Sequence, residues 1–319
     1  FYCYKQTFGH NFIVKPFITH LLRNLDQLKI HNITSISDGT HTTSYVYDAA
    51  NQLIRENNPK GGFTYIWTYD DAGNILSRHE YAYTTGTVGA LRDTVTYTYG
   101  DSSNKDILTA YDGAAITRDA IGNPLSDGTW TYTWEHGRQL KSMSDGTTTW
   151  NYTYNADGMR TSRTNGSKTY EYIYNGSQLS CMTITENGTT TTYDFTYDAE
   201  GAMVLTVNGD ARYIYVKNLQ GDIIAILDAE RTAIVEYTYD AWGNIISIEG
   251  SAKDSIGEAN PLRYRGYVYD TETGLYYLQS RYYNPEMGRF INADGYASTG
   301  QGVLGNNMFA YCGNNPVIR

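Results

Sequence analysis

The sequence predicts an all-β fold built from stacked β-hairpins, and three observations predict it. The chain of 319 residues holds 32 Tyr and 31 Gly but only 6 Pro. Its aromatic residues alternate with polar ones in short runs, and Asp-Gly or Asn-Gly pairs separate many of these runs. Successive side chains of a strand point to opposite faces, and such dipeptides supply the positive φ angles of tight hairpin turns.

The composition also excludes several classes of function. Asp and Glu number 34 against 24 Lys and Arg, a formal net charge of −10 that disfavours nucleic acid as a partner. No apolar stretch reaches the ~18 residues of a membrane span. The cysteines and histidines show no metal-ligand spacing, so no disulfide framework and no metal site are predicted. They include Cys3, Cys181, Cys312, His10, His20, His31 and His41.

Residues 1–44 precede the repeated pattern and are predicted to be partly helical. Within them, Phe17, Leu21 and Leu25 recur at helical spacing, with Pro16 placed as a first-turn proline. We expect this segment to cap or precede the sheet. The chain begins with Phe and lacks the basic, apolar and small-residue order of a signal peptide. We therefore expect it to start within a longer protein whose export signal lies upstream.

Residues 45–250 contain one repeated phrase. An alternating aromatic run leads into Tyr-Asp or Tyr-Asn, a few further residues that usually include Gly, and an apolar residue. The phrase recurs about every 21 residues. Its clearest copies are YDAANQL (Tyr47–Leu53), YDDAGNIL (Tyr69–Leu76), YNADGMR (Tyr154–Arg160), YNGSQL (Tyr174–Leu179), YDAEGAM (Tyr197–Met203) and YDAWGNII (Tyr239–Ile246). We predict that each repeat consists of two short strands and two turns.

Each run is predicted to place its aromatic residues on one face of the sheet. Trp150, Tyr152 and Tyr154 lie two residues apart, and polar residues such as Thr153 lie between them. Because a lone hairpin cannot bury that face, neighbouring repeats must cover it and continue the sheet. A buried tyrosine hydroxyl also needs a hydrogen-bond partner. We expect the tyrosine edges to line a wet interior that supplies this partner.

Two stretches outside the repeats carry weaker signals. Residues 251–261 are predicted to form a loop that leads into a different C-terminal block. Gly300, Gly302 and Gly305 match the dinucleotide-binding fingerprint, but no acidic residue follows them to hold a ribose. We therefore interpret these glycines as part of a turn and predict no cofactor.

Residues 262–319 form a block with long and specific phrases, RGYVYDTETGLYYLQSRYYNPEMGRFINADG and NMFAYCGNNPV. This block resembles the RHS repeat-associated core, and residues 45–250 resemble the YD repeats of the same family. The wording YYLQSRYYNP is most similar to that of RHS and wall-associated proteins of Gram-positive bacteria. Related YD shells occur in insecticidal Tc toxin cages and in teneurins.

The resemblance implies both a fold and a function. Family members wind their YD repeats into a hollow spiral shell, or cocoon, and the core block plugs one end. The shell encloses a downstream effector or toxin. This implies two partners for the chain, its own upstream YD repeats and that effector, in a secreted or cell-surface protein. We therefore expect a mainly non-enzymatic shell segment that encapsulates and presents the effector.

The resemblance also implies candidate catalytic residues. Self-cleavage in the family is attributed to acidic residues of the core, assisted by arginine. Asp294 matches an acidic position of the core, and Arg281 and Arg289 match the arginines of its RYY and GRF phrases. The sequence departs from the pattern at Gly295, where Pro often follows the Asp, and at Asn284, where many relatives have Asp. The bond to be cut is expected downstream of this chain.

Two alternatives to a purely structural shell stay open. The first is a self-cleaving, aspartic-type core in which Asp294 supplies the acidic group, set against the simpler interpretation of Asp294 as an Asp-Gly turn residue. The second is an adhesive surface protein whose aromatic stripes stack on cell-surface glycans. Core packing is the simpler explanation of those stripes.

Overall fold

The structure, a computed structural model, describes residues 32–295 and 306–318. Within these ranges the secondary structure is almost entirely β, with three short helical turns. The helical turns are η1 (Lys253–Gly257), η2 (Tyr264–Gly266) and η4 (Cys312–Asn314). The strands are β1 (Ser35–Ser37), β2 (Thr42–Tyr47), β3 (Leu53–Asn58), β4 (Phe63–Tyr69), β5 (Ile75–Ala82), β6 (Leu91–Thr98), β7 (Ala110–Tyr111), β8 (Ala114–Ala115), β9 (Thr117–Arg118), β10 (Pro124–Ser126), β11 (Thr131–Glu135), β12 (Gln139–Ser144), β13 (Thr149–Tyr154), β14 (Arg160–Thr164), β15 (Lys168–Asn175), β16 (Gln178–Glu186), β17 (Thr189–Asp198), β18 (Gly201–Val207), β19 (Ala211–Lys217), β20 (Ile223–Leu227), β21 (Ala233–Tyr239), β22 (Ile245–Glu249), β23 (Val268–Asp270), β24 (Leu275–Leu278), β25 (Arg281–Asn284) and β26 (Arg289–Phe290).

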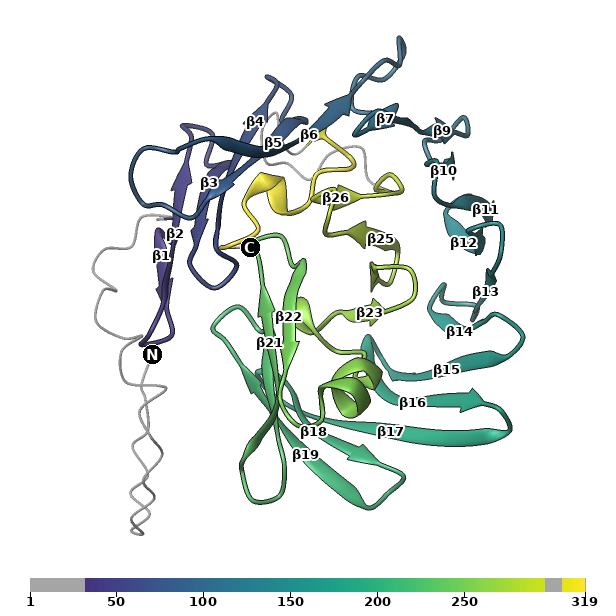
Figure 1. The fold of residues 1–319 in the computed structure, drawn as a ribbon. Helices are drawn as coiled ribbons and strands as arrows, with labels where there is room; N and C mark the ends of the chain where they lie inside the picture. The colour runs from purple at the N-terminus through teal and green to yellow at the C-terminus, as the bar shows by residue number, and fades with distance from the viewer. Residues whose placement is uncertain (1–31, 296–305, 319) are drawn as a thin grey trace.

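Three antiparallel sheets contain these strands in chain order. The first sheet holds the 8 strands β1–β8, the second sheet the 14 strands β9–β22, and the inner sheet the 4 strands β23–β26. Figure 1 shows the first and second sheets curving around the inner sheet and the end of the chain. The predicted all-β fold of stacked hairpins is therefore confirmed, and the described part of the C-terminal block (residues 262–295 and 306–318) lies inside the curve.

The aromatic residues of the repeats lie on one face, as predicted. On β13, Trp150 and Tyr152 are 2% and 3% exposed, whereas Thr153 between Tyr152 and Tyr154 is exposed to solvent. The buried face is the one that meets the C-terminal block, since the ring of Tyr152 packs edge-on against Tyr282 at 6.0 Å between centroids. The alternation in the sequence therefore marks the inner and outer faces of the sheets.

The acidic residue of the repeated phrase organises the turn that follows it. Asp70 Oδ1 accepts the backbone N–H groups of Ala72 and Asn74 at 2.9 and 2.8 Å, and its Oδ2 accepts the amide of the Asn74 side chain at 3.0 Å. Gly73 has a φ of 80°, a left-handed value that favours glycine. The same arrangement of a carboxylate around two backbone N–H groups recurs at Asp48, Asp119 and Asp240.

In five copies of the phrase, the tyrosine before that residue links the repeat to the preceding part of the chain. Its hydroxyl donates to the backbone carbonyl of an apolar residue earlier in the chain, whereas the buried hydroxyl of Tyr174 has no hydrogen-bond partner among the described residues. The expected wet interior is therefore wrong for these five hydroxyls, because their partner is protein backbone. The pairs are Tyr47 to Ile33 (2.8 Å), Tyr69 to Leu53 (2.6 Å), Tyr154 to Leu140 (2.9 Å), Tyr197 to Leu179 (2.7 Å) and Tyr239 to Ile223 (2.9 Å).

The inner sheet is buried on both faces, which explains its doubled tyrosines. Tyr276 and Tyr283 belong to the hydrophobic cluster of the first sheet, together with Trp67. Tyr277 and Tyr282 belong to the cluster of the second sheet. Neighbouring residues of a strand point to opposite faces. The phrases LYYL and RYYN therefore supply one ring to each side.

The structure differs from the sequence expectations at two places. The first hairpin begins at Ser35, ahead of the repeats expected from residue 45. Asp38 forms its turn, and the strand before this turn, Ser35–Ser37, contains no aromatic residue that would have marked it as part of the pattern. Residues 253–257, expected within a loop, form the π-helical turn η1. The helix expected before residue 31 and the glycines at 300–305 lie outside the described residues, as do Cys3, His10, His20 and His31.

No helix among residues 32–295 and 306–318 combines the length and hydropathy needed to cross a lipid bilayer.

Replacing Tyr152 with Ser is expected to destabilise the chain by about 3–5 kcal/mol, because it removes a fully buried aromatic ring. Replacing its neighbour Thr153 with Ala is expected to cost less than about 0.5 kcal/mol, because that side chain is exposed. Urea unfolding followed by tryptophan fluorescence measures both values. Equal costs at the two positions would contradict the assignment of inner and outer faces.

Candidate functional site

The structure brings two of the three predicted site residues together. Arg281 on β25 and Asp294, which follows β26, form an ion pair of 2.9 Å between Nη1 and Oδ2. Their side chains are 22% and 17% exposed. The Arg281 guanidinium also lies 3.5 Å from the centroid of Phe290, and burial lowers its pKa while Asp294 opposes that shift. Asp294 is thus a partly accessible carboxylate held by a fixed guanidinium.

The third predicted residue, Arg289, is directed to the first sheet. It is 3% exposed, and its guanidinium donates to the hydroxyl of Tyr99 and, at 2.7 Å, to the carbonyl of Asp106. It also lies 5.4 Å from the ring centroid of Phe309. These contacts make Arg289 an anchor between the C-terminal block and the first sheet, whereas Arg281 is the arginine that holds Asp294.

Two arginines of the second sheet hold the backbone just before Asp294. Arg118 Nη1 donates to the carbonyl of Ile291 at 2.8 Å, and Arg138 Nη1 donates to the carbonyl of Ala293. Burial, together with the nearby Arg289, lowers the pKa of Arg118 to about 10. Sequence reasoning missed both residues. Arg118 lies in RDAIGNPL and Arg138 lies in WEHGRQL, two imperfect copies of the repeated phrase. An arginine in an imperfect copy was the signal that the sequence offered for these residues.

A buried cluster of charges joins the second sheet to the C-terminal block. Arg160 of β14 is 0% exposed and contacts both carboxylate oxygens of Asp270, at 2.5 and 2.8 Å. Arg163 lies 3.3 Å from Asp270 and donates to Glu272 at 2.6 Å. Burial alone would lower the pKa of Arg160, but Asp270 raises it and prevails. Because buried charges are costly unless they are paired, this cluster fixes one position for the block.

Three tyrosines of the C-terminal block form hydrogen bonds with the turn after β21. Their hydroxyls donate to three consecutive carbonyls, so the block recognises the backbone of a repeat and not only its side chains. The bonds are Tyr264 to Ala241 (3.0 Å), Tyr283 to Trp242 (2.7 Å) and Tyr276 to Gly243 (2.9 Å).

Asparagines near the end of the chain contact the turns of the first sheet in a similar way. Asn314 Nδ2 donates to the Gln52 side chain at 2.9 Å and to the carbonyl of Gly73 at 2.6 Å. Asn307 Nδ2 donates to Asn74 Oδ1 at 2.9 Å. The block therefore docks on the turns of both curved sheets, and it carries the partly accessible Asp294 with it.

The repeats, the curved sheets and the docked block are features shared with known proteins. The family model for the teneurin YD-shell matches residues 14–317. The chain belongs to the teneurin YD-shell family.

Solved structures share the fold of this YD-shell chain. The crystal structure of TcdB2-TccC3 superposes with a TM-score of 0.69 and 21% identity, over 88% of this chain and 16% of that chain. The Tc holotoxin pore of Photorhabdus luminescens gives 0.68 and 19%, over 88% and 15%.

A curated relative is more similar in sequence to this chain than these two solved structures are. The tRNA nuclease WapA of Bacillus subtilis is 34% identical over 276 residues, which is 85% of this chain and 11% of that protein. A shorter match joins the chain to the toxin protein Tse5 of Pseudomonas aeruginosa, 42% identical over 60 residues, 19% of this chain and 4% of that protein. The YD-shell chain thus spans about a ninth of the length of WapA.

The two curved sheets of the YD-shell meet at a pair of buried carboxyl groups. Glu56 of the first sheet is 0% exposed, and its Oε2 accepts the N–H of Ala241 at 3.0 Å. Asp240, one residue earlier, is also buried. Burial raises the pKa of Glu56 to about 8, and the charge of Asp240 adds to this shift. Burial likewise raises the pKa of Asp240.

We expect the stability of the chain to fall as the pH rises from about 5 to about 8. The folded state binds the Glu56 proton more tightly than the unfolded state does. The stability that this proton contributes is therefore present below the unfolded pKa and is lost as the pH passes the folded pKa. Glu56→Gln should flatten the dependence of the urea midpoint on pH over this range. Glu171→Gln, on the exposed face, is the matched control and should keep the wild-type slope.

Proposed function

We propose that this chain forms the C-terminal end of a hollow β-shell that encloses and presents a downstream effector of a secreted or cell-surface toxin protein. The observation that carries the proposal is that the buried face of the sheets is the inner one and the C-terminal block lies inside it (Figure 1). The nuclease WapA and the toxin Tse5, to which the chain is similar, are named for effector activities.

The position of the last described residues supports enclosure. Val317 is 4% exposed, and its carbonyl accepts the side-chain amide of Gln220 at 3.3 Å. The carbonyl of Pro316 accepts a hydrogen bond from the guanidinium of Arg265. A polypeptide that continues from this point starts on the inner side. At the other end, β1 pairs with β2 alone among the described strands, which leaves an edge to which upstream YD repeats can add.

The burial of the aromatic residues favours a shell over a glycan-binding surface. Stacking on a sugar requires an open ring face. Tyr152 and Tyr172 expose only 3% and 4% of their surface. The rings that the sequence offered for glycans are used in packing.

Protease protection in the full-length protein tests the shell. The downstream effector should be digested by trypsin at least about a hundredfold more slowly than the same effector produced alone, because cleavage requires opening of the shell. Urea at concentrations that unfold the shell should abolish the protection. Digestion of the effector at equal rates in both proteins, with the repeats still folded by circular dichroism, would refute the proposal.

Self-cleavage is a second candidate function, and the Arg281–Asp294 pair is the observation that favours it. In peptide hydrolysis the Asp294 carboxylate would accept a proton from the attacking water. The C–N bond would then break, and the proton would pass to the leaving amine. Such a role needs the bond within hydrogen-bond reach of Asp294.

In the full-length protein, Asp294→Asn should abolish the appearance of the free effector on a denaturing gel, because the proton acceptor is lost. The exposed turn residue Asp71, changed to Asn, provides the control and should leave cleavage intact. An uncut wild-type protein, or cleavage that survives in Asp294→Asn, removes this candidate without affecting the shell.

A further inference from the structure

The two curved sheets meet through side chains and not through a strand pair. No strand of the first sheet pairs with a strand of the second sheet in the described part of the chain. Glu56 of β3 instead reaches the turn after β21, where its Oε2 accepts the N–H of Ala241 at 3.0 Å. The ring of Trp242 in the same turn lies 6.1 Å from that of Trp67 on β4. Figure 1 shows this turn, between β21 and β22, beside the first sheet. We call the contact of Glu56 and Trp67 with residues 240–244 the seam.

The seam buries two carboxyl groups that no cation neutralises directly. Glu56 and Asp240 are 0% and 5% exposed. Neither carboxyl forms an ion pair with any residue that the structure describes. Their side-chain partners are neutral amides, Asn58 at 3.0 Å from Glu56 Oε1 and Asn244 at 2.7 Å from Asp240 Oδ2. Because an unpaired buried charge is costly, such a pair favours the binding of a proton.

The groups that face the pair do not remove this cost. Arg78 of β5 lowers the pKa of Asp240, but burial raises that pKa by more. The other neighbours are mainly tyrosines, and burial raises their pKa values too, so they stay neutral. They are Tyr45, Tyr47 and Tyr65 of the first sheet and Tyr264 and Tyr283 of the C-terminal block, with Glu80 (paired with Arg92) and Asp222 (paired with Arg265) beyond them.

We propose that Glu56 and Asp240 form a proton-dependent latch between the two curved sheets. While the pair holds a proton, the seam stays closed. When both carboxyls are ionised, their repulsion and the cost of two buried charges favour a local opening, in which residues 240–244 separate from β3 while the strands within each sheet stay paired. This inference concerns the contact between the sheets and does not rest on an enclosed effector.

The direction of the pH dependence follows from the closed and open states. In the closed seam the pKa of Glu56 is about 8, and in the open seam it returns toward its ordinary value of 4.5. Closing therefore binds a proton between these two values, and the closed state weakens as the pH rises through this range. Because one proton is involved, the equilibrium constant for opening should rise about tenfold per pH unit. The latch is thus strongest in acidic solution and weakest above about pH 8.

Hydrogen exchange of the 319-residue chain, followed by mass spectrometry, tests the latch. Protection factors, which remove the intrinsic effect of pH on exchange, are compared at about pH 5.5 and about pH 7.5. Protection of residues 53–58 and 240–244 should fall about a hundredfold between these values. At the higher pH it should be at least about tenfold lower than that of β16 and β17, because the seam opens without unfolding of the sheet.

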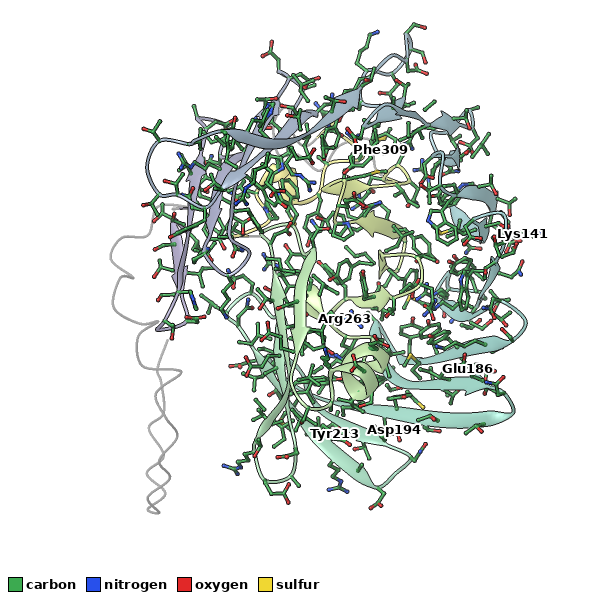
Figure 2. All side chains as sticks on the ribbon, in the orientation of Figure 1. Lys141, Glu186, Asp194, Tyr213, Arg263 and Phe309 are labelled. Atoms are coloured by element: carbon green, nitrogen blue, oxygen red, sulfur yellow. The ribbon has the colours of Figure 1, made fainter. Side chains whose placement is uncertain are left out.

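The strands β16 and β17 are a suitable internal reference, because Glu186 and Asp194 on them lie on the opposite side of the molecule from the first sheet (Figure 2). Protection of the seam that does not change with pH overturns the inference. Equal protection of the seam and of β16 and β17 at the higher pH also overturns it, because the seam then opens only when the whole chain unfolds.

Neutral replacements separate the latch from other titrating groups. With Glu56→Gln, protection of the seam should change less than about threefold between the two pH values, because the proton site is lost. Asp240→Asn should make the fall at least about threefold smaller, because it removes the neighbouring charge. This second variant keeps the turn, since the side chains of Asn155 and Asn218 accept the same two backbone N–H groups in their own turns.

Asp228→Asn is the matched control. Asp228 bonds to a backbone N–H in the turn at the opposite end of β21, away from the seam, so this variant should keep the wild-type fall. A wild-type fall in both Glu56→Gln and Asp240→Asn, or an equal reduction in Asp228→Asn, would refute the latch. Neither result depends on protease protection of the effector, which reports on the shell alone.

Discussion

The structure depends on covering the aromatic face of every hairpin. A buried aromatic ring contributes roughly 4–6 kcal/mol through the 150–250 Å² that it removes from water. The rings of one isolated repeat do not offset the conformational entropy that is lost when its residues become ordered. Each repeat therefore needs neighbours along the sheet and a cover over its inner face. Tyr277 and Tyr282 provide that cover for the second sheet, and Tyr276 and Tyr283 provide it for the first.

The same constraint explains why the repeated aromatic residue is tyrosine. A phenylalanine would fill the space, but the tyrosine hydroxyl also satisfies a backbone carbonyl of the preceding repeat, as Tyr239 does for Ile223. Because the acceptor lies on an earlier strand, each bond fixes the offset between successive hairpins. The Asp or Asn that follows then closes the turn around its own carboxylate or amide oxygen. The pair Tyr-Asp thus combines a contact between repeats with a contact within the turn.

Local rules predicted the repeats but not the docking of the block. Alternation assigned Tyr152 to the inner face and Thr153 to the outer face from sequence alone, because a strand has a fixed period of two. No local rule separates Arg281, which pairs with Asp294, from Arg289, which pairs with Tyr99 more than 100 residues away. Such choices depend on which distant segment fills the inner space. The family resemblance supplied Asp294 as a candidate, but the arginines that position its backbone emerged only with the fold.

The buried charges restrict the docked position of the block. Apolar packing alone tolerates small shifts of one tyrosine-rich surface over another, since many arrangements bury similar area. The pair of Arg160 and Asp270 opposes such shifts, because a shift that separates the two groups leaves both charges buried and unpaired. Asp270 precedes the hairpin that carries Arg281, so the position fixed at the second sheet is passed along the inner sheet to Asp294. The charge pair at the second sheet and the two arginines that bond to the backbone before Asp294 therefore position this end of the YD-shell together.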